Sequence, residues 1–517
     1  MGLVPHLQLI IYIYIYIYIY ICVCVGNNET DRLALLEFKA KITHDPLQLL
    51  SSWNDSIHFC QWRGVTCGRR HQRVIVLDLL PFSELVGSIS PHVGNLSFLK
   101  HLSLLDNSFH NEIPLEIDRL RRLQFLRLYN NTHIGKIPRN LSHCTNLKFI
   151  NFGRNLLDGE IPTTLGTFSK LRVINFENNN LTGSIPPSLG NLSSLEVFAT
   201  AWNNLGGSIP HSFGQLTKLT NFYVGENRLS GRIPPSIFNL SSLQVFDVGV
   251  NQIQGHLPLD IGITLQNIKG LSIFANQFTG PIPISISNAS NLWQLQLNDN
   301  NLSGKVPSLD KLNKLSQFLI YFNELGNGGA NDLSFLCSLT NATDLSFVWM
   351  HVNNFGGELP KCIVNFSTTL TQLILSTNKI SGNIPIGIGN LTNLNVLAME
   401  NNKLSGHIPF EIEKLQKLQY LVLSANNFFG NIPSSLGNLT ILTALYLDHN
   451  NLQGSIPLSL VKCENMIDLD LSENNLNGTI SYQVLGLSFT AISLDLSANK
   501  FTGVLPIEVE NLKNLER

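Results

Sequence analysis

The chain carries little charge. Lysine, arginine, aspartate and glutamate together make up 14% of its 517 residues, and its formal net charge is -2. Proteins that bind nucleic acid cluster lysine and arginine to meet the phosphates, and no such basic stripe is present. Nucleic acid is therefore not an expected partner.

Catalytic and cofactor-binding motifs are missing as well. The chain has no Walker A phrase, no G-x-S-x-G elbow, no H-E-x-x-H, and none of the H-R-D, D-F-G or V-A-I-K signatures of a kinase. Gly326, Gly328 and Gly329 form no phosphate-binding fingerprint after a strand. We therefore expect no enzyme activity in this chain, no cofactor and no metal site.

What the chain does contain is an asparagine that recurs at steps of mostly 24 residues. Each one follows an apolar residue five positions before and another three positions before, as Leu421 and Leu423 precede Asn426. The phrase L-x-L-x-x-N at this period is typical of a leucine-rich repeat solenoid. We call these residues the ladder asparagines: Asn107, Asn131, Asn155, Asn179, Asn203, Asn227, Asn251, Asn276, Asn300, Asn323, Asn353, Asn378, Asn402, Asn426, Asn450, Asn474 and Asn499.

Each phrase predicts a short strand with one apolar side. Leu445 and Leu447 alternate with Tyr446, so the leucines would face the core and the tyrosine the outside. A single coil cannot bury that apolar side, whereas stacked coils bury it continuously. A buried ladder asparagine can bond to backbone groups that would otherwise lack partners. We therefore expect an α/β solenoid with a parallel sheet on its concave face.

A second phrase, L-x-G-x-I-P-x-x-L/I-G-N-L, fills the other half of each period and is clearest at residues 181–192, 380–391 and 452–460. Its glycine permits a turn and its proline fixes φ, so the segment bends around the convex side. The G-x-I-P phrase resembles the plant extracellular type of leucine-rich repeat. That resemblance implies a right-handed superhelix of about 18 repeats over residues 74–517, the last one incomplete.

The first 25 residues form a separate apolar segment. Leu7 to Val25 is long enough to span a bilayer and could equally be the core of a signal peptide, although no lysine or arginine precedes it. Isoleucine and tyrosine alternate strictly from Ile11 to Tyr20, as an in-frame dinucleotide repeat in the gene would encode. We expect a signal peptide or signal-anchor-like segment here, and not a strand.

Residues 27–73 have the pattern of an N-terminal cap. An amphipathic helix is expected over residues 31–42, with apolar residues at Leu33, Leu36 and Ala40 and with Leu35 and Phe38 beside them. Asp45 followed by Pro46 indicates the start of a second short helix that would end at residue 53.

The cap ends in the motif C-x-W-x-G-V-x-C, from Cys60 to Cys67. It resembles the N-terminal capping module of plant receptor ectodomains. The resemblance implies a disulfide between Cys60 and Cys67 and a shielding role for Trp62 at the end of the core. A zinc site is the alternative, although no ligand pair of suitable spacing lies nearby.

Four further cysteines divide into two kinds. Cys144 and Cys463 stand at the same offset before the next strand, as small buried apolar residues would. Cys337 and Cys362 are close to one coil apart, so they are the other candidate bridge, which the sequence alone leaves open.

Fifteen N-x-S/T sequons favour a secreted glycoprotein, and a cysteine pair in the cap favours the same oxidising compartment. Several sequons arise inside the repeat phrase itself. The candidate glycosylation sites are Asn28, Asn54, Asn95, Asn130, Asn140, Asn180, Asn191, Asn239, Asn288, Asn301, Asn341, Asn365, Asn390, Asn438 and Asn477.

The positions four, two and one before each ladder asparagine are expected to face outward and are free to vary, as a solenoid needs in order to specify a partner. Aromatic and arginine side chains dominate binding hot spots. The alternative is that each such side chain only packs on its neighbours. Our candidate ligand-binding residues are Tyr129, Arg154, Trp202, Tyr223, Glu226, Phe274, Tyr321, Trp349 and His351.

One step of the ladder is longer than the others. Thirty residues separate Asn323 from Asn353, with an insertion over residues 326–336. Such a loop often adds binding specificity, and the alternative is a neutral surface excursion.

The cap, the period, the convex phrase and the inserted D-L-S-F-L-C-S-L-T-N together resemble the ectodomains of plant leucine-rich repeat receptor kinases, in particular those of immune receptors. The resemblance implies a plasma-membrane protein with a transmembrane helix and a cytoplasmic Ser/Thr kinase, in which a peptide or protein ligand on the concave face recruits a co-receptor. The chain stops inside a repeat with no cysteine pair to cap that end, so we expect a truncated ectodomain whose membrane contact lies in an absent segment or in the N-terminal run. The alternative is a secreted recognition protein similar to the polygalacturonase inhibitors.

Overall fold

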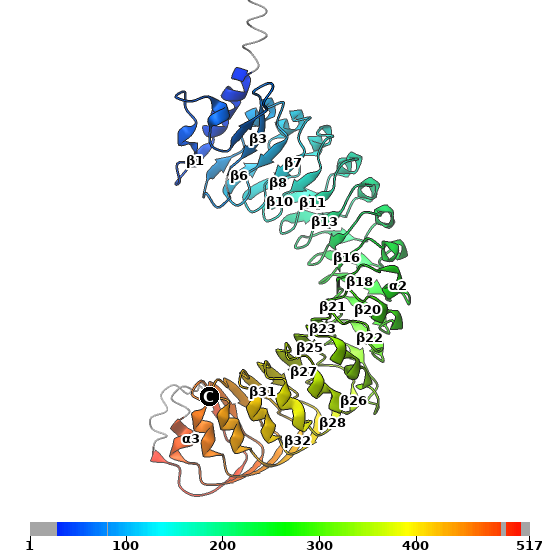
Figure 1. Ribbon diagram of the computed structural model, residues 1–517, viewed down its shortest axis with the longest axis vertical. Helices are drawn as coiled ribbons and strands as arrows, with labels where there is room; N and C mark the ends of the chain where they lie inside the picture. The colour runs from blue at the N-terminus through cyan, green and yellow to red at the C-terminus, as the bar shows by residue number, and fades with distance from the viewer. Residues whose placement is uncertain (1–27, 80, 487–492, 508–517) are drawn as a thin grey trace, which may run out of the picture. The chain divides into compact units, whose positions relative to one another are not determined.

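The computed structural model describes residues 28–79, 81–486 and 493–507. These fall into two compact units, the first through Leu243 and the second from Gln244, and each is a stack of coils (Figure 1). The expected signal segment and the end of the last repeat lie outside the described residues. Within the described ranges, no helix is long and apolar enough to cross a membrane.

The ladder phrases form three-residue strands that pair in parallel with the next coil, and we call the sheet they build in each unit the ladder sheet. In the first unit β2 (Val65–Cys67) runs antiparallel to the first of them. The ladder strands there are β3 (Val74–Asp78), β5 (His101–Ser103), β7 (Phe125–Arg127), β9 (Phe149–Asn151), β11 (Val173–Asn175), β13 (Val197–Ala199) and β15 (Asn221–Tyr223).

The second unit continues the same pattern. Its ladder strands are β17 (Val245–Asp247), β19 (Gly270–Ser272), β21 (Gln294–Gln296), β23 (Gln317–Leu319), β25 (Phe347–Trp349), β27 (Gln372–Ile374), β29 (Val396–Ala398), β31 (Tyr420–Val422), β33 (Ala444–Tyr446), β35 (Asp468–Asp470) and β37 (Ser493–Asp495). In-register pairing places equivalent residues of successive coils side by side.

Short second strands follow the ladder asparagines. In the first unit they are β6 (Ser108–Glu112), β8 (Thr132–Lys136), β10 (Leu156–Glu160), β12 (Asn180–Thr182), β14 (Gly206–Gly207) and β16 (Arg228–Gly231). Two strands of the same sheet precede the first ladder asparagine: β4 (Val86–Ser88), which pairs in parallel with β6, and β1 (Ile42–His44) of the cap, which runs antiparallel to β4. In the second unit they are β18 (Gln252–Gly255), β20 (Gln277–Gly280), β22 (Asn301–Gly304), β24 (Glu324–Leu325), β26 (Gly356–Glu358), β28 (Lys379–Gly382), β30 (Lys403–Gly406), β32 (Asn427–Asn431), β34 (Asn451–Gly454), β36 (Asn475–Gly478) and β38 (Lys500–Phe501).

Short helices, mostly 3₁₀, complete the coils. Most have one turn and follow the I-P phrase, whereas η11 has eight residues and follows the insertion. In the first unit these are η3 (Pro91–Asn95), η4 (Leu115–Arg119), η5 (Arg139–His143), η6 (Thr163–Thr167), η7 (Pro187–Asn191), η8 (His211–Gln215) and η9 (Pro235–Asn239). In the second they are α2 (Ile261–Thr264), η10 (Ile284–Asn288), η11 (Ser334–Asn341), η12 (Lys361–Asn365), η13 (Ile386–Asn390), η14 (Phe410–Lys414), η15 (Ser434–Asn438), η16 (Leu458–Lys462) and α3 (Tyr482–Gly486).

The ladder asparagines connect successive coils, which confirms the role expected for them. Asn426 is 8% exposed, and its Nδ2 donates to the carbonyl oxygens of Leu423 and Ser424 in its own coil and of Met399 in the preceding coil, at 3.0–3.2 Å. Its Oδ1 accepts the backbone N–H of Leu404 at 2.9 Å. One side chain thus satisfies four backbone groups that would otherwise be unpaired in the interior.

The residue before every ladder asparagine has a left-handed backbone, with φ between 49° and 58°. This turn tucks the asparagine inward and leaves the preceding side chain outside, as for Trp202, which is 61% exposed. Residues with a β-branch, such as Val250 and Val352, adopt this conformation too, at a cost of about 1 kcal/mol or more. The hydrogen bonds of the asparagine therefore impose the turn regardless of local preference.

The cap begins with a helix over residues 28–39, and our prediction of its apolar side was wrong. Ala34, Leu35 and Phe38 are buried, whereas Leu33 is 50% exposed. The reason is that the buried Asp31 at 0% exposure forms an ion pair with Arg73 at 2.7 Å, which turns the Asp31 side of the helix toward the coils.

The second cap helix is shorter than predicted. Its N-cap residue is Gln48 and not Asp45 as predicted, although the Asp45 carboxylate accepts the N–H groups of Leu49 and Leu50 at 2.9 and 2.8 Å. The one-turn helix η1 (Leu49–Ser52) nevertheless begins only there, after Gln48 with φ 50°. The motif that follows contains η2 (Phe59–Gln61).

Both cysteine pairs singled out in the sequence are joined in the structure. Cys60 bonds to Cys67 within the cap, so neither is a zinc ligand, and Cys337 of η11 bonds to Cys362 of η12. Trp62 is buried and stacks on Trp53 with ring centroids 5.4 Å apart. The shielding residue is thus held inside the cap.

Cys144 and Cys463 are fully buried free thiols. Burial raises the pKa of Cys144 to about 12 and that of Cys463 to about 11, with Asp118 adding to the effect at Cys144. Both therefore stay protonated and unreactive near neutral pH.

The insertion in the long step is a folded loop on the side of the second strands, since it follows β24 and leads into η11. Asp332 is 3% exposed, and its Oδ2 accepts the backbone N–H groups of Asn327, Gly328, Gly329 and Gly356 at 2.9–3.2 Å. The loop is thus held by one buried carboxylate and the nearby disulfide, away from the ladder strands.

We predict that Asn450→Ala lowers the free energy of unfolding by about 2–4 kcal/mol, because four backbone groups lose their partner. The matched control is Asn451→Ala, the exposed neighbour, which should change stability by less than about 0.5 kcal/mol. Chemical denaturation measures both. Equal effects of the two substitutions would contradict the role assigned to the ladder.

His133 is a buried exception two residues after a ladder asparagine, where neighbouring coils have Phe109 and Leu157. Its Nδ1 lies 3.1 Å from the carbonyl oxygen of Asn111, and its Nε2 has no hydrogen-bond partner. Burial lowers the pKa of His133 from 6.5 to about 4, so the folded chain keeps the ring neutral while the unfolded chain protonates it.

We therefore predict a stability loss of up to about 3 kcal/mol as pH falls from about 6.5 to about 4, and none from this residue above that window. His133→Leu should remove that part of the pH dependence, whereas the control His211→Leu, at an exposed position, should retain it. Thermal unfolding measured across this pH range checks the difference.

Candidate functional site

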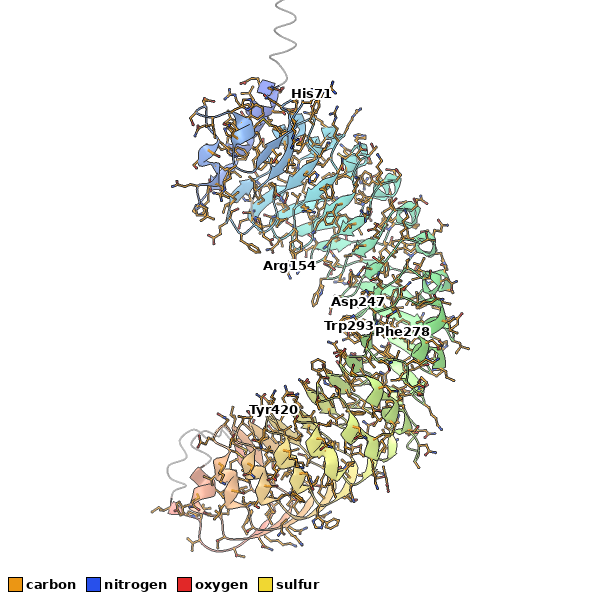
Figure 2. The ribbon with its side chains drawn as sticks, in the orientation of Figure 1. His71, Arg154, Asp247, Phe278, Trp293 and Tyr420 are labelled. Atoms are coloured by element: carbon orange, nitrogen blue, oxygen red, sulfur yellow. A yellow bond between two sulfur atoms is a disulfide. The ribbon has the colours of Figure 1, made fainter. Side chains whose placement is uncertain are left out.

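The outward side chains of the ladder sheet form a continuous surface in each unit, and we call it the ladder face. It comprises the residues six, four, two and one positions before each ladder asparagine. Figure 2 labels Arg154 on this face in the first unit and Tyr420 on it in the second. Neighbouring ladder strands lie about 4.8 Å apart, so side chains of successive coils are in contact range along the face.

An aromatic cluster occupies the ladder face at β23 and β25 in the second unit. Tyr321 stacks on His351 with ring centroids 4.4 Å apart and planes 9° apart, and it lies 5.7 Å from Trp349. Phe322 contacts both Tyr321 and His351, and Phe347 contacts Trp349 at 6.0 Å. We call these five residues the aromatic cluster. Three of our candidate residues therefore contact one another.

The cluster offers polar atoms as well as rings. Trp349 Nε1 and His351 Nδ1 have no hydrogen-bond partner. Burial lowers the pKa of His351 to about 4, and burial together with nearby Asp299 raises the pKa of Tyr321. The histidine is therefore neutral and the tyrosine keeps its proton near neutral pH, so the cluster is an uncharged surface, and the unpaired Trp349 and His351 nitrogens are buried beneath it.

Two other candidate rings lie over glycines of an adjacent coil. A side chain at Gly153 would come within 3.1 Å of Tyr129 Cδ2, and one at Gly249 within 2.1 Å of Phe274 Cε1. Each ring therefore occupies the space that the missing side chain leaves. Arg154 places its guanidinium carbon 5.6 Å from the centroid of Tyr129.

The remaining candidates lie apart from these contacts. Trp202 is 61% exposed and makes no ring contact with any residue that the structure describes. Tyr223 is half-buried and its hydroxyl accepts from Asn221 Nδ2 at 2.9 Å, and Glu226 is half-buried one coil after Trp202. These three residues are accessible without forming a cluster of rings.

Sequence reasoning missed the column six positions before each ladder asparagine. This column contains His101, Phe125 and Phe149, which contact one another in sequence at 4.4 and 6.3 Å, and also Phe347 and Tyr420. Strand alternation could have identified it, because positions six, four and two before the asparagine face the same side.

The far end of the ladder face in the second unit is acidic. Asp448 and Glu473 hold His449 between them, at 2.9 and 3.1 Å, which raises the pKa of His449, chiefly through its hydrogen bond to Asp448. Tyr446 precedes this group on β33 and carries a raised pKa, mainly through burial. Nowhere in the described ranges do three metal-ligating side chains converge as a metal site would need.

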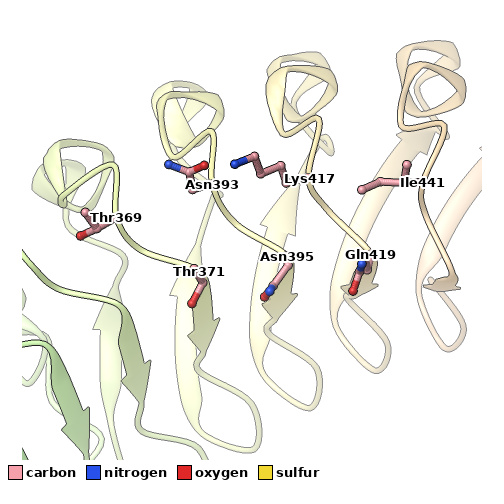
Figure 3. A pocket seen from close by; sticks show the side chains of 7 residues that line it. All are labelled: Thr369, Thr371, Asn393, Asn395, Lys417, Gln419 and Ile441. Atoms are coloured by element: carbon pink, nitrogen blue, oxygen red, sulfur yellow. The ribbon is translucent and has the colours of Figure 1, made fainter.

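Hollows occur beside the ladder face but hold no reacting group. Figure 3 shows one along the segments that lead into β27, β29 and β31, where Thr371, Asn395 and Gln419 repeat at the same register. A larger groove of about 1160 Å³ lies between the second strands and one-turn helices, with exposed Ile386 and Phe410 in its wall. Neither resembles an enclosed small-molecule site.

The sequons lie at the surface. Thirteen of the asparagines are exposed, and Asn28 and Asn130 are half-buried. Eight of them end short helices and so recur at one position of the coil: Asn95, Asn191, Asn239, Asn288, Asn341, Asn365, Asn390 and Asn438. Asn130 differs, because it lies on the ladder face and its Nδ2 donates to Asp106 at 2.9 Å.

Two family models match the chain. The leucine rich repeat N-terminal domain matches residues 28–68, which contain the cap helix and the Cys60–Cys67 disulfide. The Leucine Rich Repeat model matches residues 170–192, 369–391, 417–439 and 442–463.

Curated relatives are receptor kinases. The chain is 69% identical over 370 residues to the LRR receptor-like serine/threonine-protein kinase EFR of Arabidopsis thaliana, a match that covers 71% of this chain and 36% of that protein. It is 51% identical over 82 residues to the receptor kinase-like protein Xa21 of Oryza sativa, covering 15% and 8%. The chain thus spans about a third of the length of EFR and less of Xa21.

Solved structures extend the likeness over almost the whole chain. The Arabidopsis receptor kinase HAESA, in complex with the peptide hormone IDA and the co-receptor SERK1, matches with a TM-score of 0.71 and 30% identity over 94% of this chain and 88% of that one. PEPR1 with AtPEP1 matches with a TM-score of 0.59 and 28% identity over 94% and 84%. The chain therefore belongs to the leucine-rich-repeat ectodomains of plant receptor kinases.

Proposed function

We propose that this chain is the ligand-sensing part of a plasma-membrane receptor kinase and that it binds a peptide or protein ligand on its ladder face, in defence signalling. The full-length protein would add a transmembrane helix and a cytoplasmic Ser/Thr kinase, and the ligand would recruit a co-receptor ectodomain. Residues 1–25 would direct the chain to the secretory pathway, and residues 27–73 would cap the repeats.

The observation that carries the proposal is the aromatic cluster. Five rings from two adjacent coils hold one another in place, although Phe322 remains 49% exposed. Stacked pairs each contribute about 0.5–1.5 kcal/mol beyond burial, so the surface is rigid before a partner arrives. A rigid, uncharged aromatic surface suits a peptide, whose apolar side chains can pack against the rings.

The solved relatives support the class of ligand. HAESA is described in complex with a peptide hormone and a co-receptor, and another solved relative, RGFR1, is described as a plant peptide hormone receptor in complex with RGF2. EFR, with 69% identity over the matched stretch, supports a receptor of the same kind. The remaining candidates, Tyr129, Arg154, Trp202, Tyr223, Glu226 and Phe274, would contribute further contacts on the ladder faces of their units.

We predict that Trp349→Ala and Tyr321→Ala each weaken ligand binding by about 30-fold, the effect of losing a hot spot worth about 2 kcal/mol. The full chain, secreted from plant cells, would be screened against fractionated microbial extracts and synthetic peptides by surface plasmon resonance. Phe429→Ala is the matched control, since this ring is 48% exposed but lies on β32.

Thermal unfolding of each variant must match that of the wild type for the comparison to count. A ligand bound equally well by the wild type, Trp349→Ala and Tyr321→Ala would refute the placement of the site.

Secretion through the glycosylating pathway predicts a pattern of sequon occupancy. Exposed asparagines at helix ends, such as Asn390, should carry N-glycans, whereas Asn130 should be unoccupied because its Nδ2 is engaged by Asp106 on the half-buried ladder face. Glycopeptide mass spectrometry of the secreted chain measures both. Asp106→Ala should raise occupancy at Asn130, and full occupancy in the wild type would contradict the prediction.

A further inference from the structure

A group of cations on the first unit has no acidic partner. Lys100, Arg122, Arg127 and Lys148 lie on or beside the ladder face at β5, β7 and β9. Ion pairs elsewhere in this unit join Arg32, Arg73 and Arg172 to carboxylates, but none of the four cations has an ion pair or a side-chain hydrogen bond within the described ranges. We call these four residues the basic surface.

Aromatic rings hold the two arginines in fixed positions. The guanidinium carbon of Arg122 lies 3.8 Å from the ring centroid of Phe98, and that of Arg127 lies 5.0 Å from Phe149 and 5.6 Å from Phe125. A guanidinium that stacks on a ring keeps its N–H groups directed outward in its plane, where a carboxylate can accept two of them. Ring stacking thus fixes the arginines without using their hydrogen-bonding edges.

Arg127 has no hydrogen-bond acceptor among its neighbours. Its Nε is shielded from solvent and has no hydrogen-bond partner. The neighbouring side chains within the ladder strands are Phe125, Ser103 and Asn151, and none of these accepts from it.

Local electrostatics agree with the geometry. The pKa of His101, next to Phe125, is lowered first by burial and then by Arg127, Lys100 and Lys148. Asp78 opposes this effect but does not reverse it. Arg127, Lys100 and Lys148 therefore act together on one ring of the ladder face, which agrees with their lying close to one another.

We propose that the basic surface binds an acidic segment of a peptide or protein partner, with carboxylates on Arg122 and Arg127 and apolar side chains against Phe125 and Phe149. This deepens the proposed function, since it rests on the chain being a receptor for such partners. It concerns the first unit alone and does not depend on the aromatic cluster.

The test uses the full glycosylated chain and a fluorescein-labelled decaglutamate peptide, with binding measured by fluorescence anisotropy at low salt. The double variant Arg122→Gln/Arg127→Gln should weaken binding by about tenfold or more. Lys136→Gln/Arg139→Gln removes the same charge from exposed positions on β8 and η5 of the same unit, so it should leave binding within about twofold of the wild type.

Both double variants would be checked for wild-type thermal unfolding. Lys100→Gln/Lys148→Gln provides a second measurement that leaves the stacked arginines intact, and it should also weaken binding. Equal affinity of the wild type and Arg122→Gln/Arg127→Gln for decaglutamate would overturn the proposal. So would tighter binding of an oligogalacturonide through the same arginines, since that would identify a polysaccharide as the partner.

The two proposals fail separately. Trp349→Ala should leave decaglutamate binding unchanged, because Trp349 lies in the second unit. Loss of decaglutamate binding in Trp349→Ala would overturn the proposal that the basic surface is a separate site. If the basic surface binds decaglutamate but Trp349→Ala does not weaken binding of the ligand, the basic surface is retained and the aromatic cluster is refuted as a site.

Discussion

The hydrogen bonds of the ladder asparagines are the constraint on which the fold depends. Each side chain joins two carbonyl groups of its own coil to one carbonyl and one N–H of the coil before it, as Asn426 does. Nine of the ladder asparagines, Asn426 among them, are buried, so their bonds are made where water competes little. They fix the spacing of the coils and impose a left-handed residue at every step, including steps where the residue is valine. Hydrophobic burial alone would permit the coils to slide.

The rigid coil makes the ladder face a surface on which side chains are placed by their neighbours. Tyr321 and His351 stack across one step, whereas Tyr129 and Phe274 each lie over a glycine of an adjacent coil. Arginines in the first unit rest on rings, so their charge is directed outward. The same scaffold thus presents an uncharged aromatic surface in one unit and a cationic one in the other.

Much of this could be predicted from the sequence, because the period encodes it directly. The strands, the buried leucines and the function of the asparagines all follow from alternation and from the need to pair buried backbone groups. Cys337 and Cys362 could only be proposed as a pair, since their proximity depends on the short helices that bring them together. The insertion could not be placed, because its folding depends on the single buried carboxylate of Asp332.

The errors have a common physical cause. The cap helix was oriented by its apolar periodicity, yet the ion pair of Asp31 with Arg73, a residue far along the chain, decides which side is buried. The rings of Phe125, Phe149 and Phe347 were not predicted, because only positions up to four before each ladder asparagine were considered and these rings lie six before it. Contacts between coils are long-range in sequence, so a reading of one coil at a time does not show them.

The pairing of a ring with a glycine on the adjacent coil has a consequence for how such a chain can evolve. Repetitive genes gain and lose whole repeats readily, and the core tolerates this because every coil offers the same leucines and asparagine. The fit of Tyr129 against Gly153 is specific to one pair of coils, and so is that of Phe274 against Gly249. A repeat inserted between the two coils of such a pair would place a side chain next to the ring and would leave the glycine without a ring beside it. Repeats can therefore be gained or lost between many pairs of coils, but within these two pairs the order of the coils is fixed.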